Sequence, residues 1–188
     1  MDILIAGVGG QGTLLASRVL GKYALDNGFD CKLSEVHGMA QRGGSVITYV
    51  RISEKEGQKI YSPIIDEKGS DIILAFEKLE ALRYLHYLKD GGAVIYSSQE
   101  IMPMPVVTGA ESYPQGMESV LNGISVDARD LAVQAGNSKA ANSVMMGALC
   151  KKLSLDKEKF LAALVACIPQ KTIEMNKKAF ELGYAAVI

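Results

Sequence analysis

The chain has 188 residues, of which 48% are hydrophobic, and a formal net charge of -1. These values are typical of one globular domain, residues 1–188, and give no reason to expect binding to nucleic acid or to an anionic membrane. No apolar run approaches the roughly 20 residues that span a bilayer, and the strand-like start Met1–Ala6 leaves no room for a signal peptide. We therefore expect a cytoplasmic protein.

The first half of the chain predicts short strands around one helix. The apolar run Ile3–Ala6 is β-branched and followed by glycines, as in a buried parallel strand. Apolar residues then recur at helical spacing until Asn27-Gly28 ends the helix. In order, we predict a strand at 3–6, a helix at 13–25, strands at 30–36 and 45–52, and a charged turn at 53–57 that joins two antiparallel strands.

The second half alternates strands with helices and then becomes helical. We predict a strand at 71–76, a helix at 77–88, a turn at 89–92, strands at 93–96 and 124–127, a proline-containing loop or edge at 102–105, and helices at 128–135, 138–153, 156–168 and 171–183. This alternation predicts an α/β fold, with a mainly parallel, Rossmann-like sheet and helices on both faces. Partly antiparallel additions and a helical C-terminus complete the expected architecture.

A glycine motif connects the first strand to the first helix. The segment Gly7-Val8-Gly9-Gly10-Gln11-Gly12 matches G-x-G-x-x-G at this position. Glycines permit positive φ and close approach of a ligand, and the free N–H groups of a helix start favour a phosphate. In dinucleotide-binding folds an acidic residue at the end of the second strand binds ribose, and Glu35 lies near that position. A subunit that binds NAD or FAD is therefore one interpretation.

The segment that follows the second strand is unlike a plain helix start. It reads Ser34-Glu35-Val36-His37-Gly38-Met39-Ala40-Gln41-Arg42-Gly43-Gly44-Ser45. Its apolar residues do not recur at the spacing of a buried helix or strand. A loop that combines four chemically active side chains (Glu35, His37, Gln41, Arg42) with three glycines is usually a functional site. The alternative is a loop that satisfies itself, with Arg42 paired to Glu35 and glycines that only make turns.

Together, the two segments resemble the gamma-type domain of pyruvate/2-oxoacid:ferredoxin oxidoreductases. The sequence of His37–Gly44 most resembles the corresponding segment in beta subunits of indolepyruvate oxidoreductases. A third block, Gly136–Ala148, resembles the asparagine-containing helix start of the same family. The matches run from Met1 to the last predicted helix, so the resemblance covers essentially the whole chain.

The resemblance implies a small, non-catalytic subunit of a complex that decarboxylates a 2-oxoacid oxidatively with CoA and passes electrons to ferredoxin. Such complexes use thiamine diphosphate, magnesium and [4Fe-4S] clusters. The sequence has no Gly-Asp-Gly followed about a helix later by Asn-Asn, as thiamine diphosphate with its magnesium would require. Its three cysteines (Cys31, Cys150, Cys167) are scattered, whereas a cluster needs four thiolates. We therefore expect these cofactors on a large alpha subunit and none bound by this chain alone.

The resemblance and the motifs together predict ligand- or interface-binding residues, and none that is catalytic or binds a metal. The glycine motif would receive a phosphate or carboxylate, Arg42 would grip a carboxylate or a CoA phosphate, and His37 and Gln41 would donate hydrogen bonds. Asn142 with Ser143 would close the pocket. Simpler alternatives are Asn137 or Ser138 as a helix cap and His37 as a support for its own loop. The predicted set is Gly7, Gly9, Gly10, Gln11, Gly12, Thr13, Glu35, His37, Gly38, Gln41, Arg42, Gly43, Asn142 and Ser143.

Other functions stay open at this point. The chain could be the gamma subunit of a pyruvate- or 2-oxoglutarate:ferredoxin oxidoreductase, because the indolepyruvate assignment depends on one loop. It could be a dinucleotide-binding subunit. It could also be a stand-alone regulatory module that kept the fold and lost its enzyme. Neither the stoichiometry of the complex nor its 2-oxoacid follows from the sequence.

Overall fold

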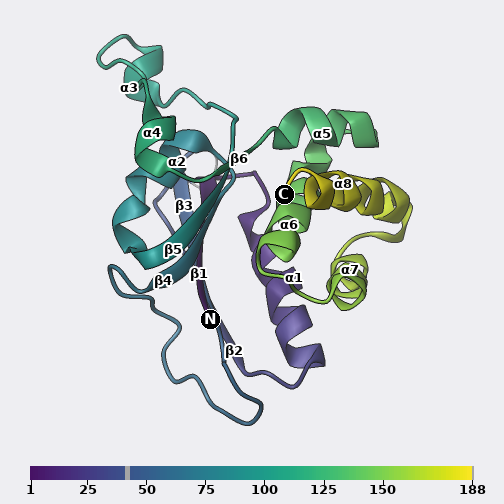
Figure 1. The fold of residues 1–188 in the computed structure, drawn as a ribbon. Coiled ribbons are helices and arrows are strands. Elements are labelled where there is room, and N and C mark those ends of the chain that lie inside the picture. Colours follow the sequence, from purple (N-terminus) through teal and green to yellow (C-terminus); the bar gives the residue numbers. More distant parts are fainter. Residues whose placement is uncertain (41–42, 188) are drawn as a thin grey trace.

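A six-stranded sheet forms the centre of the protein, for which a computed structural model describes residues 1–40 and 43–187 (Figure 1). Its strand order is β2-β3-β1-β4-β5-β6. β3 pairs antiparallel with both β1 and β2, whereas β1, β4, β5 and β6 pair in parallel. The strands are β1 (Asp2–Val8), β2 (Cys31–His37), β3 (Ser45–Ile52), β4 (Ser70–Ala75), β5 (Leu88–Ser97) and β6 (Ile124–Val126). The predicted mainly parallel sheet with antiparallel additions is confirmed.

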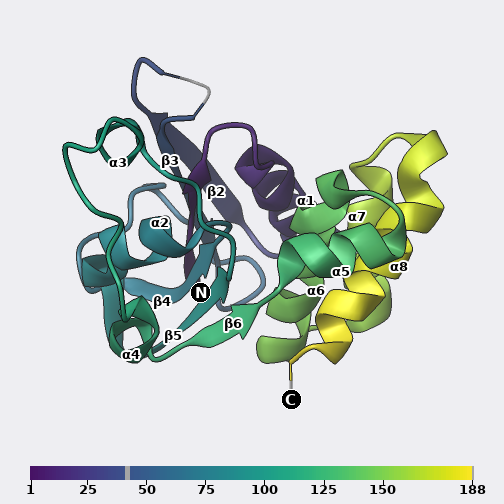
Figure 2. The same ribbon diagram turned by 90° about the horizontal axis from the view of Figure 1, so that it is seen from above.

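Helices cover both faces of this sheet (Figure 2). One face carries α1 and the C-terminal helices α5 to α8, and the other carries α2 and α4. The α-helices are α1 (Thr13–Asp26), α2 (Lys78–Arg83), α3 (Met104–Val107), α4 (Met117–Leu121), α5 (Ala128–Ala135), α6 (Ala141–Lys152), α7 (Lys157–Ala166) and α8 (Ile173–Ala185). Short 3₁₀ turns are η1 (Leu85–Tyr87), η2 (Ser138–Ala140) and η3 (Gln170–Thr172). The layered arrangement and the helical C-terminus agree with the prediction.

The alternation of side chains along β1 separates two hydrophobic cores. Ile3 and Ile5 pack with α1 and α6, whereas Leu4 and Ala6 pack with α2 and α4. All four side chains are fully buried. Each buried isoleucine or leucine stabilises the fold by about 1.5–3 kcal/mol relative to an exposed side chain. These cores fix β1 at the centre of the sheet, so the loop that leaves its carboxyl end has a rigid base.

Four predicted elements differ from the structure. The predicted helix 77–88 is only α2 and η1, and the predicted turn 89–92 lies inside β5, where the pairing with β4 shifts in register after Ser70. The segment 53–57 does not lead to a strand that pairs with β3, because β1 lies between β3 and β4. The antiparallel pair β2–β3 is instead joined by residues 38–44. Finally, the predicted loop 102–105 includes the start of α3.

Candidate functional site

The glycine loop, residues Gly9–Gly12, leaves the carboxyl end of β1 and leads into α1. Gly10 has φ +104° and Gly12 has φ +87°, and Gly12 is the residue that precedes the first turn of α1. The chain continues through α1 to strands on one side of β1 and later returns to β4 on the other side. In open α/β sheets such a switch point, beyond the carboxyl ends of the strands, is where ligands bind.

Gln11 holds the glycine loop to the ends of the neighbouring strands. Its Oε1 accepts a hydrogen bond of 2.8 Å from the backbone N–H of Val8. Its Nε2 donates to the carbonyl of Phe76, at 2.9 Å, and to Oε1 of Gln99, at 3.3 Å. Because both ends of the amide have protein partners, Gln11 shapes the site rather than offering these groups to a ligand.

A backbone pair connects the glycine loop to the β2–β3 loop, residues 38–44. The N–H of Gly9 donates to the carbonyl of Gly44 at 2.8 Å, and the N–H of Gly43 donates to the carbonyl of Gly9 at 3.3 Å. The predicted site residues Gln41 and Arg42 lie outside the described residues. The two glycine-rich segments, more than 30 positions apart in the sequence, therefore meet at one edge of the sheet.

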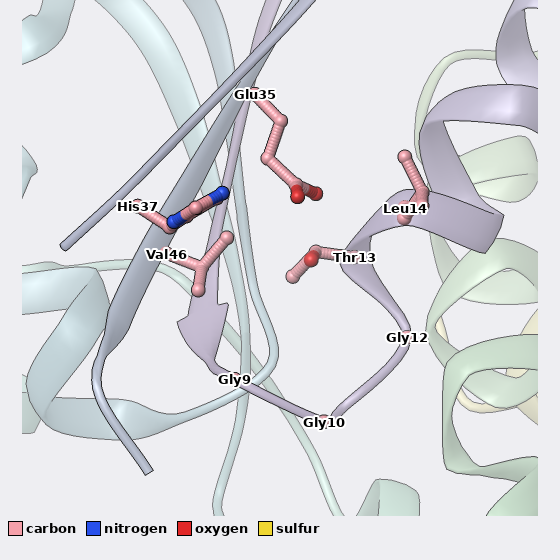
Figure 3. Close-up of a pocket in the computed structure, with 8 residues that line it drawn as sticks. All are labelled: Gly9, Gly10, Gly12, Thr13, Leu14, Glu35, His37 and Val46. Carbon is pink, nitrogen blue, oxygen red and sulfur yellow. The ribbon is translucent and has the colours of Figure 1, made fainter. Parts of the chain in front are cut away.

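The first cavity lies on the β2 and β3 side of the glycine loop and has a volume of about 370 Å³ (Figure 3). Glu35 and His37 line it from β2, and Thr13 lines it from α1. The Glu35 carboxylate points into the space between β2 and Thr13 (Figure 3), and its Oε2 accepts from the Thr48 hydroxyl at 3.4 Å. Nδ1 of His37 lies 2.9 Å from the carbonyl of Gly38. This cavity therefore contains one carboxylate and one imidazole.

The second cavity lies on the opposite side of the glycine loop and has a volume of about 360 Å³. Its polar lining comes from Gln11, Ser97, Gln99, Ser138, Lys139 and Asn142. Gly10 and Gly12 line both cavities. The first residues of α5 and α6 also line it, so the amino ends of these helices and of α1 meet there. Helix amino ends favour anions, and none of the residues that line this cavity is acidic.

The structure divides the predicted site residues among these surroundings. Gly9, Gly10, Gly12, Thr13, Glu35 and His37 line the first cavity, and Gln11 and Asn142 line the second. Ser143 lines neither cavity, because it is fully buried and its hydroxyl donates to Oδ1 of Asn176 at 2.6 Å. Gly7 is part of β1, and Gly38 and Gly43 belong to the β2–β3 loop. The predicted single site thus consists of two cavities that share a wall.

Ser97, Gln99 and Lys139 line the second cavity but are not among the residues that the sequence predicted for the site. Ser97 and Gln99 come at and after the carboxyl end of β5, where residues of a parallel sheet face the ligand edge. The strand signal at 93–96 was therefore sufficient to indicate them. Lys139 had no such signal, since its position depends on how η2 packs against α5 and α6.

The observed geometry differs from that of a dinucleotide-binding fold at two points. β3 lies between β1 and β2, so Glu35 is one strand farther from the glycine loop than the acidic residue that binds ribose. The N–H of Gly9 is already bonded to Gly44 and does not point at a phosphate. Both observations argue against the NAD or FAD interpretation.

The sequence profile of the family described as pyruvate ferredoxin/flavodoxin oxidoreductase matches residues 2–186. The chain belongs to this family. It is 42% identical to the indolepyruvate oxidoreductase subunit IorB of Thermococcus kodakarensis over 195 aligned positions, which cover 98% of this chain and 95% of the relative. The family resemblance inferred from the two loops is thereby confirmed.

Solved structures of family members share the fold. The gamma subunit of a keto/oxoacid ferredoxin oxidoreductase from Geobacter sulfurreducens is 26% identical, with a TM-score of 0.73 over 98% of this chain and 96% of that chain. In the 2-oxoglutarate:ferredoxin oxidoreductase from Magnetococcus marinus, the same fold, at 18% identity and a TM-score of 0.74, covers 99% of this chain but 30% of that chain. This member of the family is a small subunit of a ferredoxin-dependent 2-oxoacid oxidoreductase.

The cysteines of this family member do not fit an iron–sulfur cluster. Cys150 lies in α6 and Cys31 in β2, and their burial raises the pKa of each thiol to about 11. Burial also raises the pKa of Cys167. Cluster ligands are thiolates, and four are needed. Across residues 1–40 and 43–187, no three His, Cys, Asp or Glu side chains gather as metal ligands would, and no helix is long and apolar enough to cross a membrane.

Proposed function

We propose that this chain is the small subunit of an indolepyruvate:ferredoxin oxidoreductase, and that it supports oxidative decarboxylation of an aryl 2-oxoacid by a cytoplasmic complex. A large alpha subunit would hold the thiamine diphosphate, its magnesium and the [4Fe-4S] clusters, and would reduce ferredoxin. The observation that carries the proposal is the identity of 42%, over 98% of the chain, with an indolepyruvate oxidoreductase subunit. Thiamine diphosphate supplies the carbanion chemistry of such a reaction.

The residues around the glycine loop support a binding role. The buried side-chain nitrogen and oxygen atoms of the described residues all have hydrogen-bond partners. Gln11 is fully engaged by the protein, and Thr13 and Asn142 offer an uncharged hydroxyl and amide. These groups can orient a ligand, whereas they cannot take up a proton near neutral pH. We therefore assign positioning, and not bond-making, to Gln11, Thr13 and Asn142.

The second cavity is our proposed site for a phosphate group of CoA. Lys139 supplies a positive charge, and the amino ends of α1, α5 and α6 add to it. The first cavity contains the Glu35 carboxylate, which would repel an anion at that position. We propose that the first cavity, with Glu35, His37 and the β2–β3 loop, faces the large subunit, and that Arg42 and Gln41 contribute there.

The test is reconstitution with the large subunit under anaerobic conditions. Oxidation of indolepyruvate by the complex should exceed that of pyruvate, 2-oxoglutarate and branched-chain oxoacids. A preference for one of the latter would identify the chain as the corresponding gamma subunit instead. Arg42→Ala should lower turnover, and unchanged turnover would exclude a role for Arg42.

Lys139→Ala tests the CoA site separately. Loss of one charge-assisted contact costs about 1.5–3 kcal/mol, so the KM for CoA should rise roughly tenfold or more. Lys152→Ala is the matched control, because it removes an exposed lysine at the other end of α6. An equal KM in both variants would reject the site.

Two alternative functions make different predictions with the isolated chain. Tight binding of NAD or FAD in a calorimetric titration, with no partner present, would establish the dinucleotide-binding subunit. A stand-alone regulatory module would purify from its own cells without a large subunit that carries thiamine and cluster motifs. Co-purification with such a subunit under anaerobic conditions is the result that we expect.

A further inference from the structure

Two buried carboxylates stand one helical turn apart at the start of α2. Glu77 is 1% exposed and Glu80 is 4% exposed. A buried carboxylate is costly unless hydrogen-bond donors surround it, so each position needs a reason in the fold. α2 lies on the face of the sheet opposite α1 (Figure 2), and neither carboxylate lines a cavity beside the glycine loop. Their hydrogen bonds nevertheless connect them to the segments that form the walls of both cavities.

Glu80 is bonded to the first residue of β3. Its Oε2 accepts from the Ser45 hydroxyl, and its Oε1 accepts from Nε of Arg83 at 3.1 Å. The Ser45 oxygen also lies 2.8 Å from the hydroxyl of Tyr84, and since the Ser45 proton is directed to Glu80, Tyr84 is the donor of that bond. Ser45 directly follows Gly44, whose carbonyl accepts from the N–H of Gly9. Glu80 therefore fixes the end of the β2–β3 loop against the glycine loop.

Glu77 is bonded to the segment that follows β5. Its Oε1 accepts from the hydroxyl of Tyr113, at 2.8 Å, and from the N–H of Ile101, at 3.0 Å. Its Oε2 caps α2 by accepting from the N–H of Glu80 at 2.8 Å. Burial and the bond to Glu77 raise the pKa of Tyr113, so its hydroxyl stays a donor. The segment that Glu77 fixes also carries Gln99, which lines the second cavity and bonds Gln11.

We propose that Glu77 and Glu80 are positioning residues for the two walls of the glycine loop. Glu80 acts through Ser45 on the wall of the first cavity, and Glu77 acts through Ile101 and Gln99 on the wall of the second. Because the two carboxylates are joined at the start of α2, this short helix sets the separation of the two walls. The consequence for catalysis rests on the proposed function, whereas the mechanical link can be measured without it.

Amide hydrogen exchange of the full chain, followed residue by residue by NMR, tests the link. Ser45→Ala and Glu80→Gln each remove a bond of the Glu80 branch, and exchange at Gly9 should then accelerate on the order of tenfold, with Ile101 unchanged. Tyr113→Phe should instead accelerate amide exchange at Ile101 and leave exchange at Gly9 unchanged. Arg83→Ala is the matched control, because it removes only the solvent-side partner of Glu80.

Unchanged exchange at Gly9 in both Ser45→Ala and Glu80→Gln would overturn the proposal for Glu80. Acceleration of the same size in Arg83→Ala would also overturn it, since α2 would then act by its overall stability. If Glu80→Gln does not fold, Ser45→Ala still decides. For Glu77, unchanged exchange at Ile101 in Tyr113→Phe is the contradicting result.

Steady-state kinetics of the reconstituted complex separates this proposal from the CoA site. Tyr113→Phe should raise the KM for CoA severalfold and leave kcat at saturating CoA unchanged, which a general loss of folded protein would not do. If Lys139→Ala has no effect on this KM, the CoA site is wrong, and the exchange rates alone decide the positioning role. If Lys139→Ala raises the KM and Tyr113→Phe does not, the positioning role of Glu77 is wrong.

Discussion

The amide nitrogen of Asn142, near the start of α6, lies against Gly12, at the start of α1. A Cβ atom on Gly12 would lie 2.6 Å from that nitrogen, which is inside van der Waals contact. The contact joins the glycine motif to the third sequence block across the second cavity. The loop therefore needs glycine at this position for two reasons, the φ of +87° and the contact with Asn142.

Gly12→Ala should destabilise the protein and displace Asn142. The positive φ alone costs about 1–2 kcal/mol with a Cβ present, and the contact with Asn142 adds to this. Gly10→Ala is the matched control, because Gly10 has φ +104° and open space around its Cβ position. Urea denaturation of both variants measures the difference. In an Asn142→Ala background the cost of Gly12→Ala should fall, and an unchanged cost would reject the contact.

Gln11→Ala should lower the free energy of unfolding by about 1–3 kcal/mol, because the N–H of Val8 and the carbonyl of Phe76 lose their side-chain partner. Gln11→Glu keeps an acceptor for Val8 but cannot donate to Phe76, so it also tests the second bond. The measurement is chemical denaturation of the two variants. A stability equal to wild type in both would contradict the bracing role of Gln11.

Gly183→Ala should destabilise the packing of α6 on α8. A Cβ there would overlap the carbonyl of Val144, and one on Gly147 would overlap the carbonyl of Phe180. Backbone atoms of a helix cannot move aside as a side chain can, so we expect a loss of about 2–4 kcal/mol. Gly21→Ala in α1 is the control. Its Cβ would meet only the end of the Leu33 side chain, at 3.2 Å, and should be tolerated in calorimetric unfolding.

Asp30 should make the stability depend on pH in the acid range. A hydrogen bond of 2.8 Å from the N–H of Ile60 lowers the pKa of its carboxyl, so the unfolded chain, with a value of about 3.9, binds the proton more readily. The stabilisation is therefore present above about pH 4 and is lost as the pH falls through the folded pKa. In urea titrations from pH 7 to 3, the difference between wild type and Asp30→Asn should shrink. A constant difference would contradict this.

The local sequence was sufficient to predict most elements and the family. The helix 128–135 was predicted with its observed bounds, and the strand 45–52 likewise. Such segments are encoded by apolar periodicity and by glycines at their ends, which act over a few residues. The predicted helix 77–88 is too long: α2 ends at Arg83, Leu85–Tyr87 form a 3₁₀ turn, and Leu88 pairs with Ser70 of β4 as the first residue of β5.

The sequence by itself determined that one glycine-rich loop precedes the first helix and another follows the second strand. It also determined that the motifs in these loops are those of one oxidoreductase family. Only the tertiary structure decided that β3 separates β1 from β2, that Ser143 is buried, and that the glycine loop divides two cavities. The physical reason is the separation along the chain of the residues that interact. Strand order and side-chain partners such as Ser143 and Asn176 depend on contacts between distant residues, and no local pattern of the chain specifies them.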